Sequence, residues 1–233
     1  MESSYSCDLC QDTGWIMKPQ ENMAPIAVSC KCREMKKLKA MWMAAGINPE
    51  LSKLNFSNFE IWNVWSQKAR DTAAAYYKDF NNICGDRHNS ILLCGQVGSG
   101  KTHLCVALAL NFIKKEIPVV YMPYRGALTK LKQNIKDEDY YRRELLKYQS
   151  CQVLLIDDVF KGKVTEFDIN IVFEIVNYRY LNCLPIIVST EYTVDELLNF
   201  DEAIGSRIYE MCKFYTVEIE RSKSNNYRLR EQE

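Results

Sequence analysis

The sequence has no excess of charge of either sign. Its 30 Lys and Arg side chains balance 30 Asp and Glu side chains, so the formal net charge at pH 7 is zero. A strongly basic chain would indicate nucleic acid as a partner. The net charge of this chain gives no such indication. Only local clusters of charge can therefore indicate a charged partner.

Long apolar runs are also missing. No run approaches the roughly 20 residues that a helix needs to cross a bilayer. Residues 1–10, MESSYSCDLC, have no basic segment followed by an apolar one, so no secretory signal is expected. We expect a soluble, cytoplasmic protein with no membrane partner. With 47% hydrophobic residues, the chain has enough apolar side chains for a sizeable core.

From Ser90 onward, short apolar runs alternate with segments of helical pattern. The apolar runs predict five strands, over residues 91–94, 119–122, 153–156, 186–189 and 214–219. The other segments predict helices over residues 101–115, 127–135, 137–148, 167–181, 194–199 and 202–211. Continuous apolar strands separated by helices predict an α/β fold, in which a parallel sheet is covered on both faces.

The chain before Ser90 is less regular. Residues 1–32 show little periodic pattern, residues 33–46 predict a helix, residues 47–58 resemble a linker, and residues 67–80 predict a further helix. We expect a small N-terminal module over residues 1–48 and a main domain over residues 49–233. The helix over 33–46 carries Met35, Leu38, Met41 and Trp42, which form either a docking face or a face that packs within the module.

Residues 95–102, GQVGSGKT, match the G-x-x-x-x-G-K-[ST] pattern of a phosphate-binding loop (P-loop). Glycines let successive backbone N–H groups point at phosphate oxygens, and the positive end of the following helix faces the same anion. A glycine-rich turn without a ligand is the alternative, but the loop follows a buried strand and opens a helix, as phosphate binding requires. The predicted contacts with ATP include Gly95, Gln96, Val97, Gly98, Ser99, Gly100, Lys101, Thr102 and His103.

Two acids end the predicted strand VLLIDD, and they are the second candidate site. The carboxyl ends of parallel strands meet at one edge of a sheet, so Asp157 and Asp158 are expected beside the P-loop. Asp157 and the Thr102 hydroxyl are predicted to hold Mg²⁺, which prefers oxygen ligands. Lys101 is predicted to reach the β- and γ-phosphates, and Asp158 to orient or deprotonate the attacking water. Outside this context, paired acids after a strand are often helix caps or turn residues.

Four of the ten cysteines lie within the first 32 residues, as the pairs Cys7/Cys10 and Cys30/Cys32. Two close pairs can place four thiolates around Zn²⁺, and a segment this short would take its folding energy from the metal. Reduced, unliganded thiols are the alternative. Four cysteines leave no open metal position and the two histidines lie far away in sequence, so the predicted zinc is structural.

A local basic cluster lies between the second and third strands of the predicted sheet. Basic side chains interleaved with Tyr140 and Tyr141 are typical of surfaces that bind single-stranded nucleic acid. The alternative is a solvated helix, because acids such as Asp137 and Glu144 dilute the charge. The cluster consists of Lys130, Lys132, Lys136, Arg142, Arg143 and Lys147.

Together these motifs resemble the AAA+ ATPases, and within them the DnaC/DnaI-type loaders of the replicative helicase, of the phage and prophage kind. The P-loop alone identifies only the superfamily, whereas a Cys-rich start, a P-loop core and no lid domain point to the loaders. The resemblance covers nearly the whole chain. Its motifs are CDLCQDTGW, CKCRE, AGINPE, NFSNF, GQVGSGKT, VLLIDD, PIIVSTEYTVDELL, AIGSRIYEM and NNYRLR.

The resemblance implies a five-stranded sheet of order 5-1-4-3-2 and action as an oligomer through an ATP site between subunits. It implies that Arg207 is the finger that reaches a neighbour's γ-phosphate and that Arg228 acts on the nucleotide of its own subunit. A surface ion pair for Arg207 and a solvated tail for Arg228 are the alternatives. It further implies that the N-terminal region docks on the hexameric helicase and that the basic cluster contacts single-stranded DNA.

Two positions depart from the pattern of the resemblance. Asp158 stands where many AAA+ proteins have Glu, and Thr190 or Glu191 stands where Asn is common. Both departures predict a weak ATPase that acts as a nucleotide switch. The expected function is thus an ATP-dependent helicase loader that binds ATP, Mg²⁺ and single-stranded DNA, with Zn²⁺ as a structural metal.

Three other functions remain open from the sequence. An IstB-type transposition helper shares the core motifs, but the Cys-rich start is not expected of it. A small-molecule kinase would need an Arg-rich lid over the phosphates, which the sequence lacks. A zinc-stabilised DNA-binding protein with a vestigial nucleotide site would not need Lys101, Thr102 and Asp157 intact.

Overall fold

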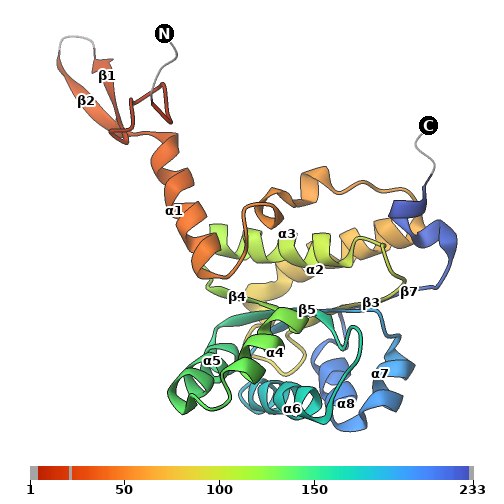
Figure 1. Ribbon diagram of the computed structural model, residues 1–233. Helices are drawn as coiled ribbons and strands as arrows, with labels where there is room; N and C mark the ends of the chain where they lie inside the picture. The colour runs from red at the N-terminus through yellow and green to blue at the C-terminus, as the bar shows by residue number, and fades with distance from the viewer. Residues whose placement is uncertain (1–4, 21–22, 231–233) are drawn as a thin grey trace.

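The computed structural model describes residues 5–20 and 23–230, without the side chains of Met23 and Glu34. A five-stranded sheet forms the centre of the body (Figure 1). Each neighbouring pair of its strands is parallel. From one edge to the other, the strands are β4 (Val119–Pro123), β5 (Val153–Val159), β6 (Ile186–Thr190), β3 (Ile91–Gly95) and β7 (Thr216–Ile219). Counted along the chain within this sheet, the order is 5-1-4-3-2, as the resemblance implied.

Helices cover both faces of the sheet, and each face has its own apolar core (Figure 1). One face packs against α2 (Val64–Ile83) and α3 (Lys101–Lys114). The other face packs against α4 (Tyr124–Gln133), α5 (Glu138–Ser150), α6 (Glu166–Leu181), α7 (Val194–Phe200) and α8 (Glu202–Met211). Successive residues of β3 alternate between the two cores, because side chains of a strand alternate in direction. Within the described residues, no helix is long and apolar enough to cross a membrane.

The predicted strands and helices of the main domain are present, with shifts at their ends. The last strand begins at Thr216 because Phe214 lies in an exposed turn. Helix α2 begins earlier than predicted, at Val64. The Asn63 side chain accepts a hydrogen bond from the Ser66 backbone N–H at 2.8 Å, and so caps the first turn.

The N-terminal residues form a hairpin that the sequence analysis did not predict. Strands β1 (Trp15–Gln20) and β2 (Met23–Ser29) pair in antiparallel fashion, with an irregular register between Lys18 and Gln20. Each strand contains a proline, which argues against a strand in the middle of a sheet. In a two-stranded hairpin each strand has a free edge, so proline is tolerated there.

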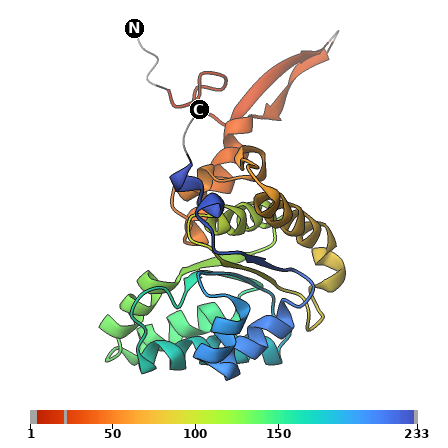
Figure 2. The ribbon, with the colours of Figure 1, turned by 90° about the vertical axis from the view of Figure 1, so that its right-hand side faces the viewer.

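Helix α1 (Lys31–Ala44) joins the hairpin to the body and projects from it as an arm (Figures 1 and 2). The body end of the arm is packed: Trp42, Ala45 and Ile47 belong to the core above α3. The Ala45 carbonyl also accepts a hydrogen bond from the Tyr121 N–H at 2.7 Å. Trp42 therefore packs against the body, which neither sequence interpretation of the helix expected.

Residues 47–58 are ordered more than a linker would be. They contain two 3₁₀ helices, η1 (Leu51–Lys53) and η2 (Phe56–Asn58), and Leu51, Leu54 and Phe56 pack against the core. The domain boundary at residues 48/49 remains a prediction, since the chain on both sides of it contacts the same core.

Candidate functional site

The P-loop connects β3 to α3 at the carboxyl edge of the sheet. Gly95, Gly98 and Gly100 have φ values of 94°, 72° and 85°, a region that residues with a Cβ rarely adopt. A Cβ at Gly95 would collide with the Ile219 carbonyl, and one at Gly98 with the Asn226 side chain. Glycine is therefore required for the backbone conformation and for the close approach of the C-terminal segment.

Lys101 is buried at the start of α3, with only 5% of its surface exposed. Its ammonium Nζ donates to the carbonyl oxygens of Gly95, at 3.0 Å, and Gln96. Burial lowers the pKa of Lys101, while the carboxylates of Asp158 and Glu191 act in the opposite direction. A cationic side chain is thus held inside the loop, beside two acids.

Asp157 and Asp158 come together at this edge because β5 is irregular there. The register of β5 against β6 shifts between Ile156 and Val159, and Asp158 has a φ of 57°. In a regular strand these two consecutive side chains would point to opposite faces. A β-bulge changes the direction of one of them. It brings Asp158 to the same side of the sheet edge as the P-loop, while the Asp157 carboxylate contacts Thr102.

The Asp157 carboxylate accepts hydrogen bonds from three hydroxyl groups. Thr102 donates to Oδ1 at 2.9 Å, Ser189 donates to the same oxygen at 2.6 Å, and Tyr121 donates to Oδ2 at 3.1 Å. Burial raises the pKa of Asp157, and the hydroxyl groups oppose this effect in part. A carboxylate beside a threonine hydroxyl is a set of oxygen donors that fits Mg²⁺.

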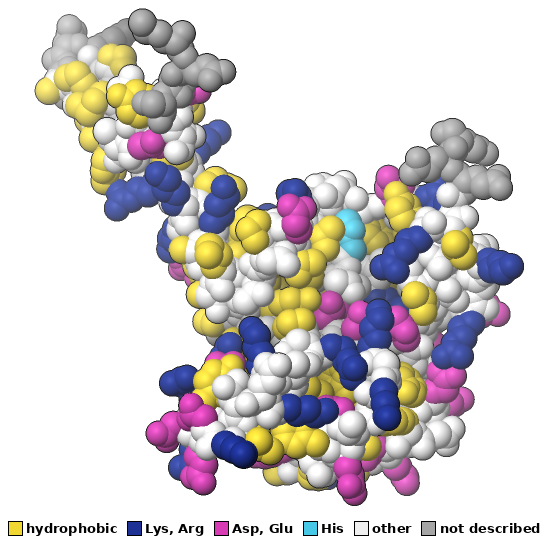
Figure 3. Space-filling view, in the orientation of Figure 1, with side chains coloured by type: hydrophobic (Ala, Val, Ile, Leu, Met, Phe, Trp, Pro, Cys, Tyr) yellow, Lys and Arg dark blue, Asp and Glu magenta, His cyan; other side chains and the backbone are white. Residues whose placement is uncertain are grey.

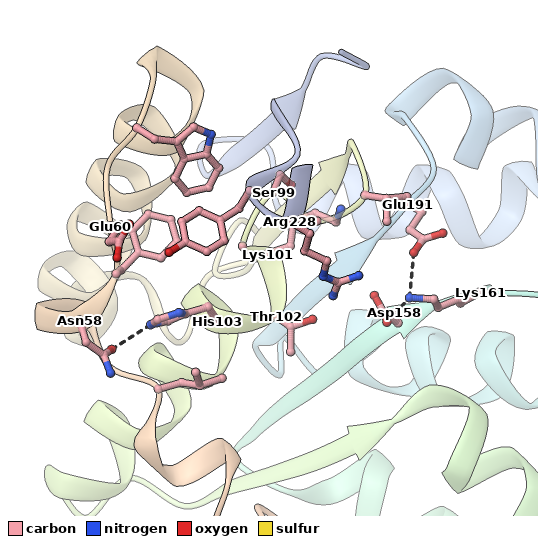
Figure 4. Close-up of a pocket in the computed structure, with 17 residues that line it drawn as sticks. Asn58, Glu60, Ser99, Lys101, Thr102, His103, Asp158, Lys161, Glu191 and Arg228 are labelled. Carbon is pink, nitrogen blue, oxygen red and sulfur yellow. Dashed lines mark hydrogen bonds and ion pairs between the residues drawn. The ribbon is translucent and has the colours of Figure 1, made fainter. Parts of the chain in front are cut away.

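Asp158 takes part in a second network, shown in Figure 4. The Lys161 ammonium lies 2.8 Å from Asp158 Oδ2 and 2.8 Å from Glu191 Oε1. Glu191 directly follows β6, so Lys161 links the ends of two neighbouring strands.

A cleft of about 360 Å³ opens between the P-loop, these acids and a wall of aromatic side chains (Figures 3 and 4). The rings of Trp62 and Tyr227 lie 5.2 Å apart, and the Tyr227 N–H donates to the Gly98 carbonyl at 3.0 Å. His103 Nε2 contacts the Asn55 carbonyl at 2.9 Å and Asn58 Oδ1 at 3.1 Å. Segments from before α2 and after β7 thus close around the P-loop.

Most of the residues predicted to bind nucleotide line this cleft. They are Val97, Gly98, Ser99, Gly100, Lys101, Thr102, His103, Asp158 and Arg228. Gly95 and Gln96 form the base of the loop, where Gln96 Oε1 accepts from the Ser222 N–H at 3.1 Å. Asp157 is outside the lining, and its carboxylate accepts the Thr102 hydrogen bond.

Thr190 and Arg207, two further predicted site residues, do not line the cleft either. Thr190 is buried and its hydroxyl donates to the Val159 carbonyl at 2.9 Å, so of the pair Thr190 and Glu191 only Glu191 lines the cleft. Arg207 lies on α8, where it donates to the Ala203 carbonyl at 2.7 Å and to Asn177 Oδ1 at 3.1 Å.

The four N-terminal cysteines form a cluster at the base of the hairpin. Their Sγ atoms all lie within 4.8 Å of one another. Cys7 and Cys30 are 3.8 Å apart, and Cys10 and Cys32 are 3.3 Å apart. A tetrahedral zinc with Zn–S bonds of about 2.3 Å requires S···S distances of about 3.8 Å. The cluster therefore fits a four-thiolate zinc site.

Sequence comparison places this architecture in a family. The model of the IstB-like ATP binding proteins matches residues 32–233. The chain belongs to this family. The match includes the P-loop, the β5 acids and the aromatic wall, and it begins at the last of the four clustered cysteines.

Two similar proteins come from Bacillus subtilis (strain 168). This IstB-like protein is 41% identical to protein YqaM over 209 residues, which are 86% of this chain and 66% of YqaM. It is 36% identical to the phage-like element PBSX protein XkdC over 225 residues, which are 93% of this chain and 83% of XkdC. A putative ATP-binding protein of insertion sequence IS21 from Pseudomonas aeruginosa is 25% identical over 148 residues, 63% of this chain and 55% of that protein.

Solved structures share the fold of this IstB-like protein. The structure of DnaI matches with a TM-score of 0.61 at 19% identity, over 75% of this chain and 94% of that one. The DnaC helicase loader matches with a TM-score of 0.61 at 21% identity, over 74% and 99%. A replication initiator DnaA bound to AMPPCP and single-stranded DNA matches with a TM-score of 0.62 at 25% identity, over 76% and 52%. The expected fold, a core like that of DnaC and DnaI, is confirmed.

Several cleft residues of the IstB-like protein escaped the sequence analysis. Trp62 and Tyr227 meet across 165 residues of chain (227 minus 62), a contact that no local pattern indicates. The sequence contains only a weak indication that Lys161 lies in the cleft. It follows Asp158 by three residues, and a turn can bring side chains at that spacing together. The segment NFSNFEIW carries another, because aromatic and amide side chains directly precede a capped helix.

Proposed function

We propose that this IstB-like protein is an ATP-dependent assembly factor that delivers a hexameric replicative helicase to single-stranded DNA. The observation that carries the proposal is the arrangement of two sites. The P-loop and Asp158 line one cleft and Asp157 contacts Thr102 beside it, while the cysteine cluster stands apart on the arm. The shared fold of the DnaC helicase loader supports the same conclusion.

ATP is the proposed ligand of the cleft. The P-loop N–H groups and Lys101 would bind its β- and γ-phosphates, and the apolar rings of Trp62 and Tyr227 offer a surface for the base. Thr102 and Asp157 would hold Mg²⁺, which neutralises phosphate charge when bound. Asp158 would orient or deprotonate the attacking water. Asp is shorter than the usual Glu at this position, which supports slow hydrolysis.

Arg207 and Arg228 would act on nucleotides of different subunits. Arg228 lines the cleft of its own chain. Arg207 lies outside that cleft, so a nucleotide contact from Arg207 requires a neighbouring copy. Self-association through the ATP site is therefore part of the proposal, and an arginine supplied by a neighbour would stabilise charge in the transition state.

The arm would dock on the helicase through a zinc-stabilised module. Several large apolar side chains of the arm are exposed and do not pack against the body. They are Trp15 (48% exposed), Met17 (62%), Ile26 (44%) and Met35 (45%). Trp42 is buried against the body, so the docking face proposed here lies on the hairpin and the start of α1.

Single-stranded DNA would bind over α4 and α5. Figure 3 shows Lys and Arg side chains gathered on the face below the cleft. Lys132 is engaged by Asp168 at 2.7 Å, and Lys147 by Glu144 at 3.3 Å. In the described part of the chain, no ion pair involves the remaining members of the cluster, which are all exposed: Lys130, Lys136, Arg142 and Arg143.

A co-elution experiment tests the loader proposal. The protein is mixed with the replicative hexameric helicase of its host, in ATP or in ADP, and separated by size-exclusion chromatography. A complex whose amount depends on the nucleotide is expected. Lys101→Ala is the matched variant: it should lose nucleotide binding and the nucleotide dependence while keeping its zinc content. No complex in either nucleotide would contradict the proposal.

The family match supports a second candidate, a transposition helper of the IstB type. Its client would be a transposase. The same chromatography with that transposase in place of the helicase separates the two candidates, because each predicts a complex with one client.

A further inference from the structure

The turn after β5 holds Lys161 in a fixed place. Phe160 is only 1% exposed, and its ring lies 4.7 Å from Phe200 and 5.8 Å from Tyr124, measured between ring centroids. The Lys161 N–H donates to the Asp158 carbonyl at 3.2 Å, which closes the turn. A buried ring on one side and a hydrogen bond on the other therefore anchor the backbone from which Lys161 extends.

The Lys161 side chain reaches back over this turn to two carboxylates. Its ammonium lies 2.8 Å from Asp158 and 2.8 Å from Glu191, and all three side chains line the cleft (Figure 4). Burial lowers the pKa of Lys161, but its hydrogen bonds with the two carboxylates raise that pKa more, so the net shift is upward. The ammonium is therefore charged at neutral pH and binds both acids.

This bridge has a consequence for the water that attacks ATP. Asp158 Oδ2 accepts the Lys161 hydrogen bond, and a water molecule at that oxygen must compete with a charged donor. Lys161 is also paired with Glu191. If the Asp158 carboxylate moves, Lys161 can follow it only as far as this second ion pair allows. Moving the Asp158 carboxylate towards substrate therefore requires breaking at least one of two ion pairs.

We propose that Lys161 is a positioning residue that restrains ATP hydrolysis by holding the Asp158 carboxylate against Glu191. The inference rests on the proposed ATPase function and identifies the part of the site that makes hydrolysis slow. Lys161 acts through Asp158 and is not assigned a contact with ATP. Whatever draws its ammonium away from Asp158 would speed the reaction.

The test compares Lys161→Gln with two matched variants. Lys161→Arg keeps a cation that can bridge both carboxylates, and Lys163→Gln removes an exposed lysine two residues away that has no ion pair among the described residues. In steady-state assays with Mg-ATP, Lys161→Gln should raise kcat about three- to tenfold, because two partly exposed ion pairs are lost. KM should change less than about twofold. Lys161→Arg should stay closer to the wild-type kcat than Lys161→Gln does, and Lys163→Gln should keep the wild-type kcat.

The outcomes separate this inference from the ATPase proposal. Binding of a fluorescent ATP analogue is measured for every variant, and melting temperatures verify folding; Lys161→Met serves if the Gln variant does not fold. If the wild-type protein hydrolyses ATP and the kcat of Lys161→Gln is equal to or below the wild-type kcat, the inference about Lys161 is overturned. The ATPase proposal is unaffected by that outcome. An equal rise in Lys163→Gln also overturns it. A wild-type protein that does not bind ATP contradicts the proposed function and the inference together.

Discussion

Asp157 is a buried acid whose ionised form is costly to the fold. Its side chain receives three hydroxyl hydrogen bonds, yet burial outweighs them and the pKa of Asp157 lies above its ordinary value. A charge that destabilises the folded protein at neutral pH is expected where function requires it. In this cleft the requirement would be an oxygen ligand for Mg²⁺.

Asp157→Asn should therefore stabilise the protein while weakening its proposed function. An amide can accept from Thr102 and Ser189 through its oxygen and donate to the Tyr121 hydroxyl. At pH 7 with EDTA and no nucleotide, urea denaturation should show a gain on the order of 1 kcal/mol, typical of such trade-offs. Mg²⁺-dependent ATP binding should fall in the same variant.

The pH dependence of this gain has a definite sign. Below the pKa of Asp in the unfolded chain, about 3.9, both states are protonated and the gain should vanish. As pH rises from there through the raised folded pKa of Asp157, the wild type should lose stability relative to the variant. Asp86→Asn, at an exposed position, is the control and should show no such trend. A gain that grows at low pH would contradict this account.

Among structural elements, the hairpin depends most on the cysteine cluster. Strands β1 and β2 contact little but each other, and Trp15, Met17 and Ile26 remain exposed. An isolated two-stranded hairpin is marginally stable in water. We infer that metal binding at the cysteines supplies the stability of this element.

Cys30→Ser should release zinc and unfold the hairpin without affecting the cleft. Cys30 is fully buried in the cluster, so loss of its thiolate removes one of four ligands. Zinc content should fall from one per chain to none, and the amides of β1 and β2 should exchange rapidly with deuterium. Cys84→Ser, outside the cluster, should retain zinc. Full zinc content in Cys30→Ser would refute the four-thiolate site.

Helix α5 is predicted to contact single-stranded DNA through Arg142 and Arg143. Arg142→Ala combined with Arg143→Ala should flatten the slope of log affinity for single-stranded DNA against log salt by about 1.4, because each phosphate contact contributes roughly 0.7. Lys78→Ala with Lys114→Ala, on the opposite face of the sheet, should leave the slope unchanged. An unchanged slope in the arginine variant would remove α5 from the DNA site.

The elements differ in how far sequence could predict them. The three central strands of the sheet, β3, β5 and β6, are buried on both faces, so their apolar runs stand out. The hairpin has no core of its own, and its prolines obscured it. In the cleft, the P-loop and the β5 acids have local patterns. The aromatic wall and the C-terminal segment meet them only through contacts across the whole chain, which a local pattern cannot contain.

At the scale of the whole molecule, the position of Arg207 predicts complementation between copies. Lys101→Ala should lack a working cleft but retain Arg207, and Arg207→Ala should retain the cleft but lack the arginine. Each variant alone should hydrolyse ATP at least about tenfold more slowly than wild type, as expected when an arginine finger is lost. Mixed under conditions in which light scattering shows self-association, they should recover part of the activity.

The alternative role of Arg207 predicts a different result. If its contacts with Asn177 and the α8 backbone only stabilise the fold, the mixture should be no more active than the average of its parts. Melting temperatures of Arg207→Ala distinguish a loss of stability from a loss of the finger.

The length of the α1 arm also fixes the direction in which the hairpin points around the helix axis, relative to the cleft. Its 14 residues span about 21 Å, at 1.5 Å for each residue. Each added residue would rotate the hairpin by about 100° around the arm, whereas seven added residues would return it to nearly the same direction, about 10 Å further out. A client bound at the hairpin would thus meet the body at an angle fixed by the number of residues in α1. Insertions of seven residues would then change the reach of the arm while nearly keeping its direction.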